Sequence, residues 1–295
     1  MSRSRNRACA IVTGVTLVGA LAMSGAGARS RPLSIYVDLP FQWFARRTPA
    51  DFIVSIDDEP VDVMTFATGP QPLNAITLLD LSDSMPSGPD GKDSIDVMKV
   101  ARRIAGVARK TDLLRIATFG QRILIGRSLL LDPASAESAA RAVTQRGGPS
   151  PLWDAIDHAV TALAGLPGLP ALIVFTDAQA SANDLGFADA MARIVGSGVL
   201  VSAVGISDEA MSQSSVQIIG RNANLQRLVD ASGGTYVELR TRKDLPIEFL
   251  AGLVANVRSR TRLEIEAPAR DGRVHRLSVR VGRAPVRAPS QITGR

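Results

Sequence analysis

Asp80, Ser82 and Ser84 put one carboxylate and two hydroxyls at alternate positions directly after the apolar run 75–79. Such a run predicts a buried strand, and open α/β sheets bind their ligands at the carboxyl ends of their strands. A ligand set made only of oxygen atoms suits Mg²⁺ or Mn²⁺. Because few of these oxygens come from carboxylates, coordination positions are left for water or for an acidic group of a partner. The three residues therefore predict an incomplete site for a hard cation, in a loop at the end of a strand.

Two other loops carry similar oxygen ligands. One is the segment Gly147-Gly148-Pro149-Ser150 before a predicted helix, and the other is Thr176-Asp177 after the apolar run 172–175. Because loops that follow parallel strands converge on one edge of a sheet, we expect the three loops to build one site. Its candidate metal ligands are Asp80, Ser82, Ser84, Ser150 and Asp177. Helix capping is an alternative role for Ser150, and an N-cap or turn is the alternative for Asp177.

The elements that would position these loops follow a regular order between residues 73 and 258. Buried apolar runs alternate with amphipathic segments, which predicts an α/β fold with a doubly wound, Rossmann-like, mostly parallel sheet covered by helices on both faces. The expected strands are 75–80, 113–119, 171–177, 199–206 and 235–239. The expected helices are 95–109, 135–145, 152–164, 185–196, 225–232 and 243–258. An antiparallel edge strand is expected at 122–131, because only Gly120-Gln121 separates it from the strand before it.

Short alternating runs flank this region on both sides. The runs 33–37, 52–56 and 61–66 predict a β-hairpin region before the main domain, and the runs 261–266 and 274–281 predict a hairpin that closes the molecule. The expected organisation is a signal peptide at 1–28, an N-terminal β-hairpin region at 29–70, the main domain at 71–260, and a C-terminal β-hairpin with a basic tail at 261–295.

The first residues have the order of an export signal. Three arginines, at positions 3, 5 and 7, precede the apolar stretch 8–23, and Ala26-Gly27-Ala28 follows it. The apolar stretch is shorter than the roughly 20 residues of a spanning helix, so we expect cleavage after Ala28 rather than a retained anchor. Cys9, the only cysteine, lies within the signal, so the mature chain is expected to have no disulfide. These features predict an exported protein, in the periplasm, the cell envelope or the extracellular space.

The charge of the chain is unevenly distributed. The formal net charge is +6, and the segment 258–295 carries ten arginines and only three acidic residues. A basic tail favours anionic surfaces, but no aromatic residues that could stack on bases are interleaved with these arginines. We therefore interpret the segment as a solvated, Arg-rich sheet face and expect no nucleic-acid partner.

The three loops together resemble a von Willebrand factor type A (vWA) domain with a metal-ion-dependent adhesion site (MIDAS). Asp80, Ser82 and Ser84 match the Asp-x-Ser-x-Ser pattern of that family, Ser150 corresponds to its separate loop threonine, and Asp177 to its later aspartate. The resemblance covers about residues 73–258, and the flanking hairpins more weakly resemble an exported bacterial subfamily.

The resemblance implies a fold, a cofactor and a partner. In such a site two serines contact the metal directly, the threonine directly or through water, and the aspartates mainly through water. The implied cofactor is Mg²⁺, or alternatively Mn²⁺ or Ca²⁺, and the implied partner is a protein that presents Asp or Glu. The implied activity is binding without catalysis.

Two residues depart from the family pattern. Ser150 lacks the branched methyl group that would restrict its side-chain rotamer. Asp83 stands where many members of the family carry glycine, and its charge would either tighten cation binding or repel an acidic partner.

Two other functions are compatible with the sequence. Ser150, Asp154 and His158 suggest a metal-assisted or serine hydrolase, although Asp154 and His158 are four residues apart on one predicted helix, which favours a surface ion pair. The other is a metal-free envelope protein whose basic C-terminal face binds anions. His275 is far in sequence from the candidate metal ligands, so a zinc centre with both histidines is not expected.

Overall fold

The computed structural model describes residues 32–39, 47–85, 95–128, 132–206, 215–239 and 247–294, with backbone only for 215–221 and 247–248. The expected signal peptide at 1–28 lies outside the described residues. Within the described ranges no helix is long and apolar enough to cross a membrane.

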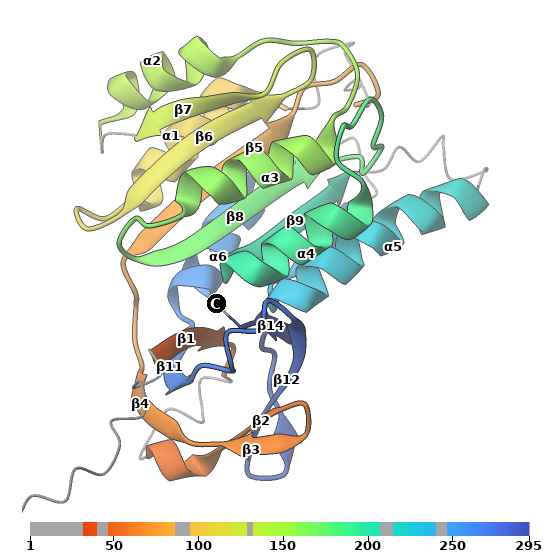
Figure 1. Ribbon diagram of the computed structural model, residues 1–295. Helices are drawn as coiled ribbons and strands as arrows, with labels where there is room; N and C mark the ends of the chain where they lie inside the picture. Colours follow the sequence, from red (N-terminus) through yellow and green to blue (C-terminus); the bar gives the residue numbers. More distant parts are fainter. Residues whose placement is uncertain are drawn as a thin grey trace, which may run out of the picture. The chain divides into compact units, whose positions relative to one another are not determined.

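The central sheet runs through the middle of the main domain (Figure 1). Over the described residues its strand order is β10-β9-β8-β5-β6-β7, with only β7 antiparallel to its neighbour. These are β5 (Leu73–Asp80), β6 (Leu113–Phe119), β7 (Leu124–Ser128), β8 (Leu169–Thr176), β9 (Leu200–Ile206) and β10 (Tyr236–Leu239). The predicted mostly parallel sheet and its antiparallel edge strand are therefore confirmed.

Helices cover both faces of the sheet, because successive side chains of a strand point to opposite faces. Leu79 of β5 packs in one core with α1, α2 and α6, whereas Leu78 packs in a second core with α3, α4 and α5. Every residue of β5 is buried, as expected for a central strand between two layers of helices. The helices are α1 (Val97–Val107), α2 (Pro133–Val143), α3 (Leu152–Leu163), α4 (Phe187–Ser197), α5 (Ser215–Ser232) and α6 (Ile247–Arg258).

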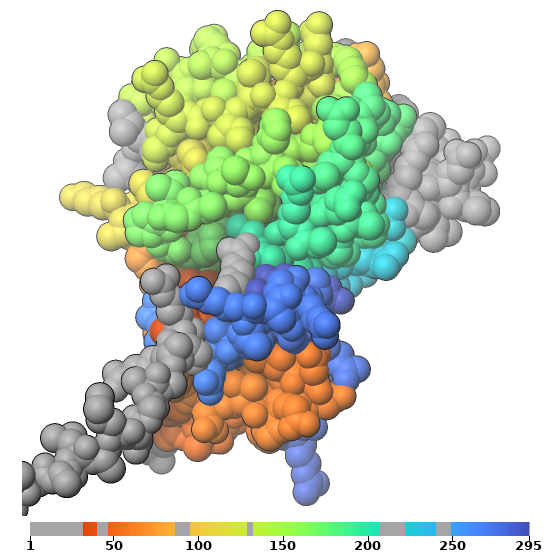
Figure 2. Space-filling view, in the orientation of Figure 1, coloured from red at the N-terminus to blue at the C-terminus, as the bar shows by residue number. Residues whose placement is uncertain are grey.

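The strands outside the main domain form one unit that combines both ends of the described chain, and we call it the flanking β region. One sheet has the order β1-β11-β4, and the other has the order β13-β12-β2-β3 with β14 also on β12. The strands are β1 (Pro32–Val37), β2 (Phe52–Ile56), β3 (Glu59–Val61), β4 (Val63–Ala67), β11 (Thr261–Glu266), β12 (Val274–Val281), β13 (Ala284–Pro285) and β14 (Gln291–Thr293), with the short helix η2 (Pro49–Asp51) before β2. In Figure 2 the N-terminal strands (orange) and the C-terminal strands (blue) share one surface.

The expected pairing of 261–266 with 274–281 is wrong. β11 pairs with β1 and β4, whereas β12 pairs with β2, so the two C-terminal strands lie in different sheets. The physical reason is burial: the apolar faces of strands from both ends, including Val54, Leu263 and Val279, meet in a third core. Hairpins do occur in the region, but they are β2 with β3 and β12 with β13.

Candidate metal centre

Asp80 lies at the carboxyl end of β5, beside the end of β8. The register pairs Leu79 with Phe175, which places Asp80 next to Thr176 on the neighbouring strand. Asp80 is 1% exposed, and Thr176 is completely buried. Thr176 lies in one of the three loops expected to build the site, but it is not among the predicted metal ligands. Its importance follows from the strand register, which the sequence does not specify.

Hydroxyl groups surround the Asp80 carboxylate. Its Oδ1 accepts hydrogen bonds from the Ser82 backbone N–H at 3.0 Å and from the Ser82 Oγ at 2.5 Å. Its Oδ2 accepts from Thr176 Oγ1 at 2.6 Å and from Ser150 Oγ at 3.3 Å. These donors are all electrically neutral. The carboxylate is thus withdrawn from water and hydrogen-bonded, but none of these contacts supplies a positive charge.

Burial raises the pKa of Asp80 to about 6. Hydrogen bonds from the Ser82 hydroxyl, the Thr176 hydroxyl and the Ser82 N–H act in the opposite direction, and the negative charge of Asp177 adds a smaller increase. Desolvation is the largest cause because an ionised carboxylate loses more hydration energy than a neutral one. A cation bound beside Asp80 would offset this cost of desolvating the ionised carboxylate.

The spacing of the serine hydroxyls fits a small cation. Ser82 Oγ and Ser84 Oγ are 3.0 Å apart. Adjacent oxygen ligands in an octahedral Mg²⁺ site, each about 2.1 Å from the ion, are separated by about 3 Å. Ser150 reaches the same carboxylate from a different loop. The predicted convergence of Asp80, Ser82, Ser84 and Ser150 is therefore present in the structure.

Ser150 is held in its loop by Ser181. The Ser150 N–H donates to Ser181 Oγ at 3.0 Å, and the Ser181 N–H donates to the Ser150 carbonyl at 2.7 Å. Pro151 is the N-cap residue of α3, and the Trp153 N–H donates a hydrogen bond to Asn183 Oδ1 at 2.7 Å. The Ser150 hydroxyl points to Asp80 instead, so the alternative role as a helix cap is not what the structure shows.

Asp177 makes a turn immediately after β8. Its Oδ1 accepts a hydrogen bond from the Gln179 N–H at 2.9 Å, which is the turn role considered from the sequence. Ala178, between them, has a φ of +57°, and its N–H donates to Thr176 Oγ1 at 3.0 Å. This bond orients the Thr176 hydroxyl toward Asp80. Asp177 is thus near the site electrostatically, and its role as a metal ligand stays a prediction.

Asp83, the unusual acidic residue of the motif, contacts the loop that carries Ser150. Its Oδ2 accepts a hydrogen bond from the Gly148 N–H at 3.0 Å, and its own N–H donates to the Gly148 carbonyl, also at 3.0 Å. Asp83 is nevertheless an exposed residue. The charge of Asp83 is evident from the sequence, whereas this bond to a distant loop is not.

The groups of the hydrolase alternative have other contacts. The carboxylate of Asp154 accepts hydrogen bonds from the N–H groups of Asp184 at 2.9 Å and Leu185 at 2.8 Å. His158 is exposed, and the Ser150 hydroxyl donates to Asp80. In a catalytic triad the base would accept from the serine and the acid would orient the base. The described geometry provides neither contact.

The sheet order, the helices on both faces and the hydroxyl-rich carboxylate at the carboxyl edge form the arrangement expected of a vWA domain. The predicted α/β fold is confirmed.

Comparisons with known proteins found similar solved structures at low sequence identity. No family model and no curated protein matches the sequence. Among solved structures, the chain is similar to the conserved hypothetical protein BatB from Bacteroides thetaiotaomicron, with 15% identity, 63% of this chain and 98% of that chain covered, and a TM-score of 0.46. It is similar to manganese-loaded TRAP from Plasmodium vivax, with 14% identity, 77% and 82% covered, and a TM-score of 0.45. It is also similar to proximal thread matrix protein 1 from the mussel byssus, with a zinc-occupied MIDAS motif, with 12% identity, 67% and 48% covered, and a TM-score of 0.48.

Proposed function

We propose that this protein is an exported binding module that holds a divalent cation, Mg²⁺ in the first place, and uses it to capture a carboxylate of a partner protein. The observation that carries the proposal is the environment of Asp80. This carboxylate is 1% exposed, and the described hydrogen bonds to it all come from neutral groups. A buried charge is costly unless it is paired, and a cation among the surrounding oxygens would pair it.

Each residue has a defined part in this function. Ser82, Ser84 and Ser150 would supply hydroxyl oxygens to the cation, and Asp80 would balance its charge and orient the hydroxyls. Asp177 would act from the end of β8, through water or as a hydrogen-bond acceptor. When bound, the cation supplies an open coordination position for a carboxylate oxygen of the partner. Thr176 would keep Asp80 in place by its short hydrogen bond.

We propose binding without catalysis and a location in the periplasm, the cell envelope or the extracellular space. The location is supported by the basic, apolar and small-residue order of residues 1–28. Binding is supported by the contacts of Ser150 and Asp154, which serve the site and the fold rather than a triad.

The cation is tested by titration of purified residues 29–295 with Mg²⁺, Mn²⁺ and Ca²⁺, followed by calorimetry and thermal unfolding. The wild type is expected to gain about 4 kcal/mol of stability at a free cation concentration 1,000 times the dissociation constant. Ser82→Ala/Ser84→Ala is expected to lose this gain while it remains folded. Ser278→Ala, on an exposed position of β12, is the control. A folded wild type that neither binds nor is stabilised by any of the three ions would disprove the assignment.

The partner is tested by capture from envelope extract with and without chelator. We expect captured protein that is released by chelator and is absent with Ser82→Ala/Ser84→Ala. Capture that survives chelator but is weakened steeply by salt would favour the metal-free alternative with a basic binding face.

A further inference from the structure

Asp83 joins the two loops that carry the candidate hydroxyl ligands. It lies between Ser82 and Ser84, and its carboxylate accepts from the Gly148 N–H at 3.0 Å while its N–H donates to the Gly148 carbonyl at 3.0 Å. The side chain and backbone of Asp83 thus hold both backbone polar groups of Gly148 on the opposite loop. Ser150 follows Gly148 by two residues.

The loop around Gly148 depends on contacts with its neighbours. Gly147 and Gly148 have φ values of +87° and +85°, which non-glycine residues rarely adopt. A Cβ on Gly148 would lie 2.7 Å from the Gln121 Cα, so a side chain at this position would collide with the neighbouring turn. Glycines cannot anchor the loop with side chains of their own, and free glycines gain the most conformational freedom when contacts are lost. Its conformation therefore depends on bonds such as those from Asp83.

Ser150 lies between attachments on either side. Gly147 donates its N–H to the Leu81 carbonyl at 2.8 Å and accepts from the Gln121 N–H at 2.6 Å. Asp83 holds the loop on the side before Ser150, and Ser181 holds the backbone of Ser150 itself. Between these attachments the Ser150 hydroxyl reaches Asp80 at 3.3 Å, the longest of the described hydrogen bonds to that carboxylate. The contact of Ser150 with Asp80 is therefore the one most easily lost if the loop moves.

We propose that Asp83 is a positioning residue: its carboxylate fixes the loop 147–150 and thereby keeps the Ser150 hydroxyl at Asp80. The position that is glycine in many vWA domains is used here as a clamp between two loops. Ser150 is a smaller and less restricted ligand than threonine, and the clamp compensates by restricting the backbone that carries it. The effect on cation binding rests on the proposed function, whereas the effect on the loop does not.

Two variants separate the hydrogen bond from the charge of Asp83. Asp83→Asn removes the charge but keeps a side-chain oxygen that can accept from Gly148, and Asp83→Ala removes both. Asp62→Ala removes an exposed carboxylate elsewhere and is the control for net charge. The readouts are the exchange rate of the Gly148 amide hydrogen by NMR, measured with chelator, and the Mg²⁺ dissociation constant by calorimetry.

The expected result is rescue by the conservative variant. Asp83→Ala is expected to speed Gly148 exchange and to raise the Mg²⁺ dissociation constant, each about tenfold, the size of one hydrogen bond. For Asp83→Asn and Asp62→Ala, the Gly148 exchange rate and the Mg²⁺ dissociation constant are expected to stay within about threefold of the wild-type values. If Asp83→Ala does not fold, Asp83→Gly replaces it.

Three outcomes would overturn the proposal. The first is unchanged Gly148 exchange in Asp83→Ala. The second is an equal loss of Mg²⁺ affinity in the Asn and Ala variants, which would mean that charge alone acts. The third is faster exchange without any change in affinity. If the wild type itself binds no cation, the proposed function fails, and Gly148 exchange still decides whether Asp83 holds the loop.

Discussion

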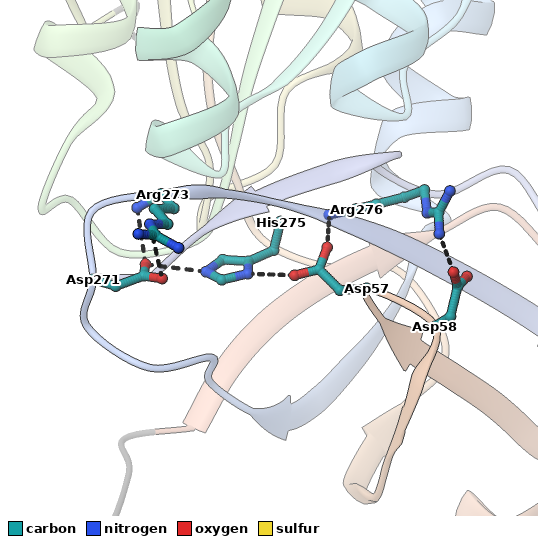
Figure 3. A network of polar contacts seen from close by, with 6 residues as sticks. All are labelled: Asp57, Asp58, Asp271, Arg273, His275 and Arg276. Atoms are coloured by element: carbon teal, nitrogen blue, oxygen red, sulfur yellow. Dashed lines mark hydrogen bonds and ion pairs between the residues drawn. The ribbon is translucent and has the colours of Figure 1, made fainter.

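Two regions of this protein use aspartate in opposite ways. At the candidate metal centre, Asp80 is buried among neutral hydroxyls, and burial raises its pKa to about 6. In the flanking β region, Asp57 and Asp271 lie at the surface on either side of His275, and hydrogen bonding lowers the pKa of both carboxyls (Figure 3). The difference lies in the partners: the described donors to Asp80 are neutral, whereas Asp57 and Asp271 share a histidine whose own pKa is raised.

The surface network connects three segments of the flanking β region. His275 Nδ1 is 2.8 Å from Asp57 Oδ2, and its Nε2 is 3.1 Å from Asp271 Oδ1. Asp57 also accepts from the Arg276 N–H at 2.8 Å, and the guanidinium of Arg276 pairs with Asp58. In Figure 3 the imidazole lies between the two carboxylates. The bond to Asp57 is the main reason why the pKa of His275 is raised.

The largest effect is expected at Asp80 in the cation-free protein. Its folded-state pKa of about 6 lies above the ordinary value of 3.8, so the folded protein retains the proton longer than the unfolded chain. The resulting stability is fully present below pH 3.8 and is lost as pH rises to about 6, in total about 3 kcal/mol. Asp80→Asn should abolish this loss. Urea unfolding with chelator from pH 4 to 8 gives the free energy of unfolding of the wild type and of the variant. The difference between the two should change across this pH range, and a constant difference would contradict the prediction.

A smaller effect is expected from the hydroxyl of Thr176. Thr176→Val removes the donor at 2.6 Å and leaves Asp80 buried with fewer bonds, so stability should fall by about 1–3 kcal/mol at pH 8. The fall should be smaller at pH 5, where the carboxyl is protonated. Thr176→Ser keeps the hydroxyl and is the control. Equal losses at both pH values would mean that packing, and not the hydrogen bond to the carboxylate, explains the result.

The surface network should respond to pH more weakly, and only its two carboxyls should respond in the direction opposite to Asp80. Stability from the raised pKa of His275 is present below pH 6.5 and is lost as pH rises through the raised value, whereas that from Asp57 and Asp271 is lost as pH falls below 3.8. The charged groups facing His275 are Asp57, Asp271 and, beyond them, Arg273 and Arg276, while β14 places Ile292 opposite it.

His275→Gln should therefore remove a contribution to stability that is greatest between pH 3.8 and the raised pKa of His275. Salt at 0.5 M should weaken the contribution, because the groups are near water, but should leave the Asp80 effect largely unchanged. Urea unfolding at pH 5.5 and pH 8, at low and high salt, measures both. A His275 effect that is insensitive to salt would contradict the comparison.

The smallest effect is expected for Arg276→Ala. Its guanidinium and the Asp58 carboxylate are both largely exposed, at 66% and 76% of the side chain, and such pairs contribute about 0.5 kcal/mol or less. Thermal unfolding at low and high salt should give nearly the same midpoint as the wild type. A shift as large as that of Thr176→Val would show that the surface network acts as a single cooperative unit.

The sequence by itself determined the elements of the main domain and most of the candidate site. The alternation of apolar runs and amphipathic segments located the strands and helices of the main domain, because periodicity is a local property of the chain. The exception is α5, which begins at Ser215 rather than at the expected residue 225. The Asp-x-Ser-x-Ser spacing likewise predicted that Asp80, Ser82 and Ser84 share one loop, and the structure confirms that the Ser150 loop meets it.

Only the tertiary structure decided which distant groups meet. The β5–β8 register placed Thr176 beside Asp80, and the β2–β12 pairing brought Asp57 to His275, which is 218 residues later in the chain. It also decided that Asp83 bonds to Gly148 and that β11 and β12 lie in different sheets. A strand with one apolar face can pair with several partners, and the choice depends on which arrangement buries all the apolar faces together, a property of the whole chain.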